Sequence, residues 1–179
     1  MGFAGRLAPE KGADVLLRAM PAVIGHVPDA RLVVAGEGPE SRSLRMLAAD
    51  LGIGDRTRFL GHLAPPDLDA AFAAAWVQAV PSVWDEPFGL VAPEAMMRGT
   101  AVVASAAGGL AESVVHGETG LLVPGNDPDA LAAALVRILS SRETAEAMGA
   151  AGRRRALSEF QESDYIEAFV QIYRELLAA

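Results

Sequence analysis

Residues 76–104 read WVQAVPSVWDEPFGLVAPEAMMRGTAVVA, and this stretch indicates the fold class most clearly. An apolar segment at 76–80 leads into a loop, then a helix-forming segment at about 90–98, and then a second apolar segment at 101–104. Short apolar runs bounded by Pro and Gly are typical of buried strands, and a helix between two of them indicates parallel pairing. The stretch therefore predicts a parallel sheet with helices on its faces.

The same alternation runs along the rest of the 179 residues. Further strands are predicted at 2–4, 31–35, 57–60 and 120–123, and further helices at 11–25, 39–51, 67–75, 109–115, 128–140, 142–157 and 162–178. Right-handed crossovers between such strands give a doubly wound sheet. We therefore predict an α/β protein with a Rossmann-like, doubly wound parallel sheet in a single domain.

Composition excludes several classes of function. The net charge of −8 disfavours nucleic acid and anionic membrane as partners, and the lack of cysteine excludes disulfides and thiolate metal sites. The three histidines are not spaced for a zinc site, so no metal is expected. No apolar run is long enough to span a membrane and no signal peptide is visible, which predicts a cytoplasmic protein. Peripheral membrane placement of the full-length protein stays open.

Two carboxylates, Glu86 and Glu94, flank a glycine-containing turn that opens a predicted helix. A helix N-terminus presents unpaired N–H groups that suit a phosphate, and carboxylates accept hydrogen bonds from hydroxyls. Pro93 fits the first turn, where its missing N–H is not needed. Phosphate and hydroxyls together describe a sugar nucleotide. A glycosidase acid–base pair and two solvated loop residues are the alternatives.

The chain has fifteen cationic residues, and Lys11 is the only lysine among them. It lies in Gly5-Arg6-Leu7-Ala8-Pro9-Glu10-Lys11-Gly12, directly after the first predicted strand. Lysine is a compact point charge and arginine a planar fork, so Arg6 and Lys11 together suit a polyphosphate. A surface helix that happens to carry a lysine is the alternative. On the first reading, replacing Lys11 would weaken diphosphate binding and cost little stability.

The carboxyl ends of parallel strands lie on one edge of a sheet, where ligands bind. Arg6, Lys11, His62 and Glu86 each follow a predicted strand, so we expect them on the same rim. Gly108-Gly109 also follows a strand and could approach a phosphate or simply form a turn.

Two other motifs give weaker indications of function. Gly36-Glu37-Gly38 lacks the third glycine of a dinucleotide fingerprint, since Ser41 stands there, and this argues against NAD binding. The basic triplet 153–155 is predicted to be a solvated helix face.

These motifs together resemble the C-terminal, donor-nucleotide-binding domain of retaining GT-B glycosyltransferases of family four (group 1). The resemblance covers essentially the whole chain. It is carried by Gly5-Arg6-Leu7 with Glu10-Lys11-Gly12, Val34-Ala35-Gly36-Glu37-Gly38-Pro39, Phe59-Leu60-Gly61, Pro81-Ser82 with Glu86-Pro87-Phe88-Gly89-Leu90, Glu94-Ala95-Met96, Gly99-Thr100 and Gly120-Leu121-Leu122-Val123-Pro124.

The resemblance implies a role for each residue. Arg6 and Lys11 would neutralise the donor diphosphate, Glu86 would contact the transferred sugar, and Glu94 would bind the ribose hydroxyls. Backbone amides of Phe88, Gly89 and Leu90 would meet the phosphates and sugar, and the base would lie near Leu60 and Gly61. The catalytic residues would thus be Arg6, Lys11 and Glu86. The family needs no metal and no cofactor, since the nucleotide-diphosphate sugar (with UDP, GDP or ADP) is a substrate.

Members of that family carry an N-terminal domain that binds the acceptor, and the resemblance covers none of it. Residues 1–160 are therefore expected to be the nucleotide-sugar-binding domain, and 161–179 a helix that would cross to the missing domain. Its apolar stripe could otherwise drive self-association. We expect this chain alone to be inactive. The alternative is a non-catalytic nucleotide-binding module or a subunit that needs a partner chain.

Overall fold

The computed structural model describes residues 1–178, apart from the side chain of Asp164. Six strands form one sheet in the order β3-β2-β1-β4-β5-β6. Every pairing in it is parallel, so the predicted doubly wound α/β class is confirmed. The strands are β1 (Gly2–Ala4), β2 (Leu32–Ala35), β3 (Thr57–Gly61), β4 (Val77–Val80), β5 (Ala101–Ser105) and β6 (Gly120–Val123).

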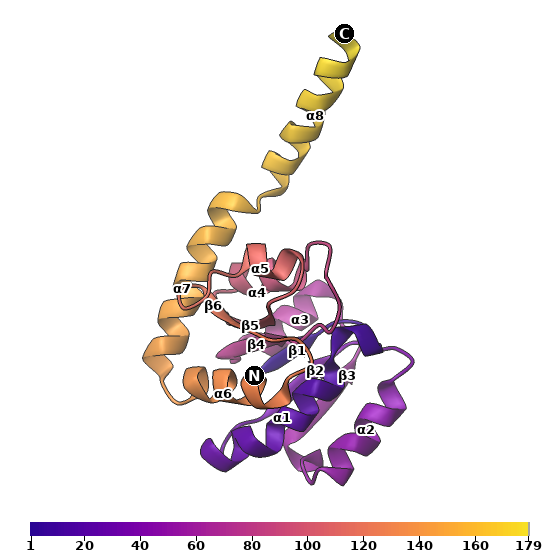
Figure 1. Ribbon diagram of the computed structural model, residues 1–179, viewed down its shortest axis with the longest axis vertical. Helices are drawn as coiled ribbons and strands as arrows, with labels where there is room; N and C mark the ends of the chain where they lie inside the picture. Colours follow the sequence, from indigo (N-terminus) through magenta and orange to yellow (C-terminus); the bar gives the residue numbers. More distant parts are fainter. Residues whose placement is uncertain (179) are drawn as a thin grey trace.

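Helices cover both faces of the sheet (Figure 1). One face carries α1 (Ala13–His26), α2 (Ser41–Asp50) and α6 (Pro128–Leu139). The other face carries α3 (Pro65–Phe72), α4 (Val91–Met97) and α5 (Gly109–Ser113). The long helix α7 (Arg142–Glu159) contributes side chains to the cores on both faces. Two 3₁₀ turns, η1 (Pro9–Lys11) and η2 (Gly54–Arg56), complete this part of the chain.

Strand β5 shows why its sequence is apolar throughout rather than alternating. All five of its residues are buried. Val103 packs in the core with α1 and α6, whereas its neighbours Val102 and Ala104 pack against α4 and α5. A parallel strand covered by helices on both faces has no solvent side, and its sequence is therefore continuously hydrophobic.

Two helices that start near a proline begin at a different residue from the one predicted. Helix α3 begins at Pro65, two residues early, because proline is suited to the first helical turn, where its missing N–H is not needed. Helix α2 begins at Ser41, so Pro39 precedes it instead of lying in its first turn. Pro93 does lie in the first turn of α4, as predicted.

Helix α8 (Glu162–Ala178) projects away from the rest of the molecule (Figure 1). Every described side chain along it is exposed. The exposed apolar residues include all seven that the sequence pattern placed on one stripe: Tyr165, Ile166, Phe169, Ile172, Tyr173, Leu176 and Leu177. That this stripe packs against a second domain or drives self-association remains a prediction. Within the described residues, no helix combines the length and hydrophobicity needed to cross a membrane.

The strand order creates one crevice at the carboxyl edge of the sheet. From β1 the chain moves outward through β2 and β3, and then returns to place β4 on the other side of β1. The helices that follow β1 and β4, which are α1 and α4, therefore pack on opposite faces of the sheet. In open α/β sheets, such a reversal of strand order is where ligands bind.

Candidate functional site

Two loops meet at this crevice: the β1 loop, residues 5–12, and the β4 loop, residues 81–90. Gly12 has φ 65°, and a Cβ there would lie 1.9 Å from the carbonyl oxygen of Pro81. Only glycine allows both that backbone conformation and that approach. The N–H of Val83 also donates a 3.0 Å hydrogen bond to the carbonyl of Glu10. These contacts bring the side chains of the two loops together.

The central contact joins Lys11 to Glu86. Lys11 Nζ donates to Glu86 Oε1 at 2.6 Å, and Ser82 Oγ donates to the same oxygen at 2.7 Å. The side chain of Glu86 is only 8% exposed and that of Lys11 27%. Lys11 Nζ also lies 5.4 Å from the ring centroid of Trp84, a cation–π distance. The carboxylate and ammonium are thus held in one orientation before any ligand binds.

The environment of Glu86 favours its charged form. Burial raises the pKa of this carboxyl, but hydrogen bonds from Lys11, Ser82 and Trp84 and the charge of Lys11 together bring the pKa below its ordinary value. Glu86 is therefore an anion at neutral pH. An anionic carboxylate at the edge of a crevice accepts hydrogen bonds from hydroxyl groups.

Arg6 lies on the same rim but has a different partner. Its guanidinium pairs with Glu10, four residues later, and its side chain is 65% exposed. The pKa of Glu10 is lowered by a hydrogen bond from the backbone of Glu10 itself, while burial acts in the opposite direction. The hydrogen bond and the charge of Arg6 lower this pKa further. Arg6 thus reaches the rim as predicted, and it is the more exposed of the two cations.

Two adjoining hollows occupy the crevice. The first, of about 440 Å³, is lined by Lys11, Ser82, Glu86, Glu94 and the residues Pro87–Val91 of the β4 loop and α4, among others. The second, of about 450 Å³, lies toward β2 and is lined by Arg6, His62, Leu63 and Glu94, among others. Glu94 borders both hollows, and a ligand that spans them would pass this carboxylate.

Most of the predicted site residues are therefore brought together. Phe88, Gly89 and Leu90 line the first hollow as expected. Leu60 and Gly61 are not among the residues that line the two hollows. The carbonyl of Gly61 instead accepts a 2.7 Å hydrogen bond from the N–H of Gly36 at the edge of the sheet. The next two residues, 62 and 63, line the second hollow instead. Contact of a base with Leu60 and Gly61 stays a prediction.

The sequence interpretation missed Ser82 and Trp84. Ser82 is 1% exposed, so its hydroxyl needs a partner, and Glu86 supplies it. The available signal was a serine four residues before a carboxylate in a loop after a buried strand. No comparable signal marks Trp84.

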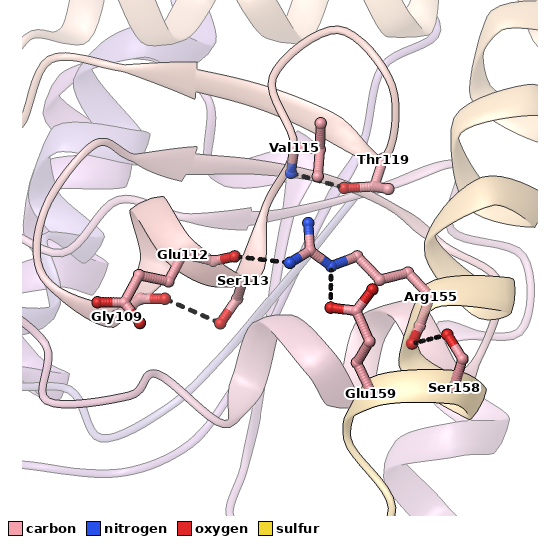
Figure 2. Close-up of polar contacts among 8 residues, drawn as sticks. All are labelled: Gly109, Glu112, Ser113, Val115, Thr119, Arg155, Ser158 and Glu159. Atoms are coloured by element: carbon pink, nitrogen blue, oxygen red, sulfur yellow. Dashed lines mark hydrogen bonds and ion pairs between the residues drawn. The ribbon is translucent and has the colours of Figure 1, made fainter.

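The prediction of a solvated basic triplet holds for Arg153 and Arg154, which are exposed, and is wrong for Arg155, whose side chain is only 22% exposed. Arg153 donates to the carbonyl of Met97 at the end of α4. Arg155 donates from Nη2 to the carbonyl of Glu112 on α5 at 3.0 Å, and from Nε to Glu159 at 3.0 Å (Figure 2). Carbonyls in the last turn of a helix lack intrahelical partners and attract cations, which the sequence pattern could not reveal.

No group of three or more histidine or acidic side chains suited to a metal ion occurs among residues 1–178 as described.

Comparison with known proteins adds three findings. A family model described as "Glycosyl transferases group 1" matches residues 1–155. Over 155 residues the chain is 44% identical to a D-inositol 3-phosphate glycosyltransferase of Corynebacterium glutamicum (strain R), which covers 83% of this chain and 37% of that protein. The structure of a sucrose-phosphate synthase from Thermosynechococcus elongatus matches 99% of this chain and 45% of that one, with a TM-score of 0.90 and 38% identity.

A further solved structure holds a ligand. Anabaena Alr3699/HepE in complex with UDP-glucose matches 99% of this chain and 48% of that one, with a TM-score of 0.85 and 28% identity. In each of these comparisons the chain spans less than half the length of the similar protein.

Proposed function

The chain belongs to the group 1 glycosyl transferases, and we propose that it is the part of such an enzyme that binds the nucleotide-diphosphate sugar donor. Because the chain spans 37% of the C. glutamicum relative, transfer of the sugar to an acceptor is proposed for a longer protein. Residues 1–160 would form the donor-binding domain, and 161–179 the helix that crosses to a second domain.

One observation carries this proposal: the Lys11–Glu86 pair at the crevice between β1 and β4. A diphosphate requires cations, and a sugar requires hydroxyl acceptors. The first hollow offers both, with Lys11 beside Glu86, and Arg6 borders the second. A carboxylate held at 2.6 Å from a lysine serves a glycosidase acid poorly, since the contact disfavours protonation.

Each group then has a role in the reaction. Lys11 and Arg6 would stabilise the negative charge that develops on the departing nucleoside diphosphate, which is where catalysis by charge is strongest. Glu86 would orient the transferred sugar through its hydroxyls. Glu94, which borders both hollows, would hold the ribose. The UDP-glucose complex of the similar HepE structure supports a donor of this class.

Retention of the anomeric configuration and independence of divalent metal are the finer parts of the proposal. The two cations supply the charge that a metal would otherwise bring to the diphosphate. In the longer protein, NMR of the product should show the anomeric configuration of the donor, and EDTA should leave the rate unchanged. An inverted product or a strict need for metal would contradict these parts and leave donor binding intact.

Calorimetry on the 179-residue chain tests donor binding directly. A few charge-assisted hydrogen bonds, less the cost of immobilising the ligand, give a Kd on the order of 0.1–1 mM for a nucleoside diphosphate. UDP, GDP and ADP should be compared, each beside its nucleoside. No heat with any diphosphate at millimolar concentration would overturn the proposal. Binding by this chain without transfer by any longer protein would favour a non-catalytic nucleotide-binding module.

A further inference from the structure

The C-terminal end of α7 contacts the β4 loop, although about 70 residues separate the two along the chain. Phe160, which follows the last residue of α7, packs edge-on against Phe88, with ring centroids 5.8 Å apart and an interplanar angle of 84°. Edge-to-face pairs of this kind are favoured by the ring quadrupoles. Arg155 lies 5.8 Å from the centroid of the same Phe160 ring, so the two residues form one unit.

This unit also holds α5. Arg155 donates to the carbonyl of Glu112 in the last turn of α5, and its geometry is fixed by the second bond to Glu159 (Figure 2). Within α5, Ser113 Oγ donates to the carbonyl of Gly109 at 2.8 Å. A five-residue helix has few hydrogen bonds of its own, and the bond from Arg155 ties its last turn to α7.

Helix α5 in turn packs against the backbone of the β4 loop. The N–H of Gly109 donates to the carbonyl of Glu86 at 2.7 Å. A Cβ at Gly108, which has φ 52°, would lie 2.2 Å from that same oxygen, so backbone packs directly on backbone. Leu110 is fully buried and lies against Gly89. A shift of α5 would therefore move the backbone that carries Glu86 and Gly89.

We propose that Arg155 and Phe160 are positioning residues for the β4 loop: they fix the loop that carries Glu86 and the 88–90 amides without touching the ligand. Arg155 acts through α5 and Phe160 acts through Phe88. The effect on a ligand rests on the proposed donor site, whereas the effect on the loop itself does not.

Helix α7 offers a matched control. Arg142 pairs with Glu146 through the same spacing of four residues that joins Arg155 to Glu159. The Arg142 side chain is 75% exposed and that of Arg155 22%. Arg142→Ala thus removes the same kind of ion pair from the same helix, at its first turn and away from α5.

Hydrogen exchange of the ligand-free chain tests whether Arg155 and Phe160 hold the β4 loop in place. The amides of Gly109 and Ala92 donate to the carbonyls of Glu86 and Gly89, so their exchange reports on the β4 loop. Amides of the buried strand 102–104 serve as the reference for global unfolding.

Arg155→Ala and Phe160→Ala should speed exchange at those two loop-contact amides about tenfold relative to the reference, as expected for one lost contact. Arg142→Ala and Phe160→Tyr should match the parent. Equal exchange in all variants would overturn the proposal. So would an increase that includes the reference amides to the same degree, because the residues would then only stabilise the fold.

Calorimetry tests the effect on the ligand. Arg155→Ala and Phe160→Ala should weaken nucleoside diphosphate binding about threefold to tenfold and leave nucleoside binding unchanged, because the β4 loop faces the diphosphate and sugar. Phe160→Tyr should restore parental affinity. Equal losses for diphosphate and nucleoside would overturn the ligand effect. If the parent binds no diphosphate, the proposed function fails, and the exchange experiment alone decides whether Arg155 and Phe160 position the loop.

Discussion

Replacing Lys11 by methionine tests the centre of the site, because it removes the ammonium and keeps an unbranched, flexible side chain that is one heavy atom shorter. The sequence alone predicted little cost in stability, whereas the burial of Glu86 leads us to expect a larger one. Glu86 is nearly buried, and without Lys11 it keeps hydrogen bonds from Ser82 and Trp84 but no cation. Removing one partner of a fully buried pair costs about 3–5 kcal/mol, and of an exposed pair below about 1. Since Lys11 is partly exposed, we expect about 1–2 kcal/mol.

The loss should depend on pH in a defined direction. In the parent, the pKa of Glu86 lies below its ordinary value of 4.5, so its charged form contributes stability at neutral pH that disappears as the pH falls through that lowered pKa. In Lys11→Met, the hydrogen bond and the charge of Lys11 no longer lower the pKa of Glu86, so this pKa rises relative to the parent. The difference in unfolding free energy between parent and variant should therefore be full near pH 7 and should shrink as the pH falls below about 4.5.

Urea unfolding at several pH values measures this difference, and calorimetry measures the ligand. Loss of a charge-assisted hydrogen bond, about 1.5–3 kcal/mol, predicts at least tenfold weaker diphosphate binding with nucleoside binding nearly unchanged. Arg18→Met is the control, because Arg18 and Asp14 form an exposed pair at 3.8 Å. If Lys11→Met binds UDP, GDP and ADP as the parent does, the phosphate role is wrong. A stability difference that does not vary with pH would refute the coupling to Glu86.

Ser82→Ala should raise the pKa of Glu86, because one of the hydrogen bonds that favour the carboxylate is lost; a ¹³C NMR titration of Glu86 that matches the parent would contradict this. Truncation after Ser163 should leave the unfolding free energy within about 0.5 kcal/mol of the parent, because the described side chains of α8 are exposed. Light scattering should show association of the parent that the truncated chain lacks, and a parent that is monomeric at every concentration would remove the case for self-association. The 179-residue chain should transfer no glucose from UDP-glucose, with or without divalent metal, because the proposed donor-binding part by itself would supply only one wall of the closed cleft that transfer needs; turnover by the purified chain would show that it is self-sufficient.

The sequence determined the architecture because the signals for it are local. The uniformly apolar run 101–104 and the helical spacing on either side of it identify a strand covered on both faces, and no long-range information is needed. The placement of Arg6, Lys11 and Glu86 on one rim follows from the same reasoning, since every parallel strand ends at the same edge. Helix boundaries were less certain, as Pro39 and Pro65 show, because a proline near a helix start fits several registers.

Which of those rim residues touch depends on how the chain packs in three dimensions. Lys11 and Glu86 are 75 residues apart and meet because the strand order places β4 beside β1, which no local pattern specifies. The same is true of Arg155, whose sequence context is an ordinary basic helix face and whose partner is a backbone carbonyl on α5. Carbonyls are present at every residue, so the sequence cannot indicate which one a side chain will bind. Local propensity fixes elements one at a time, whereas a site made from their ends depends on how the whole chain packs.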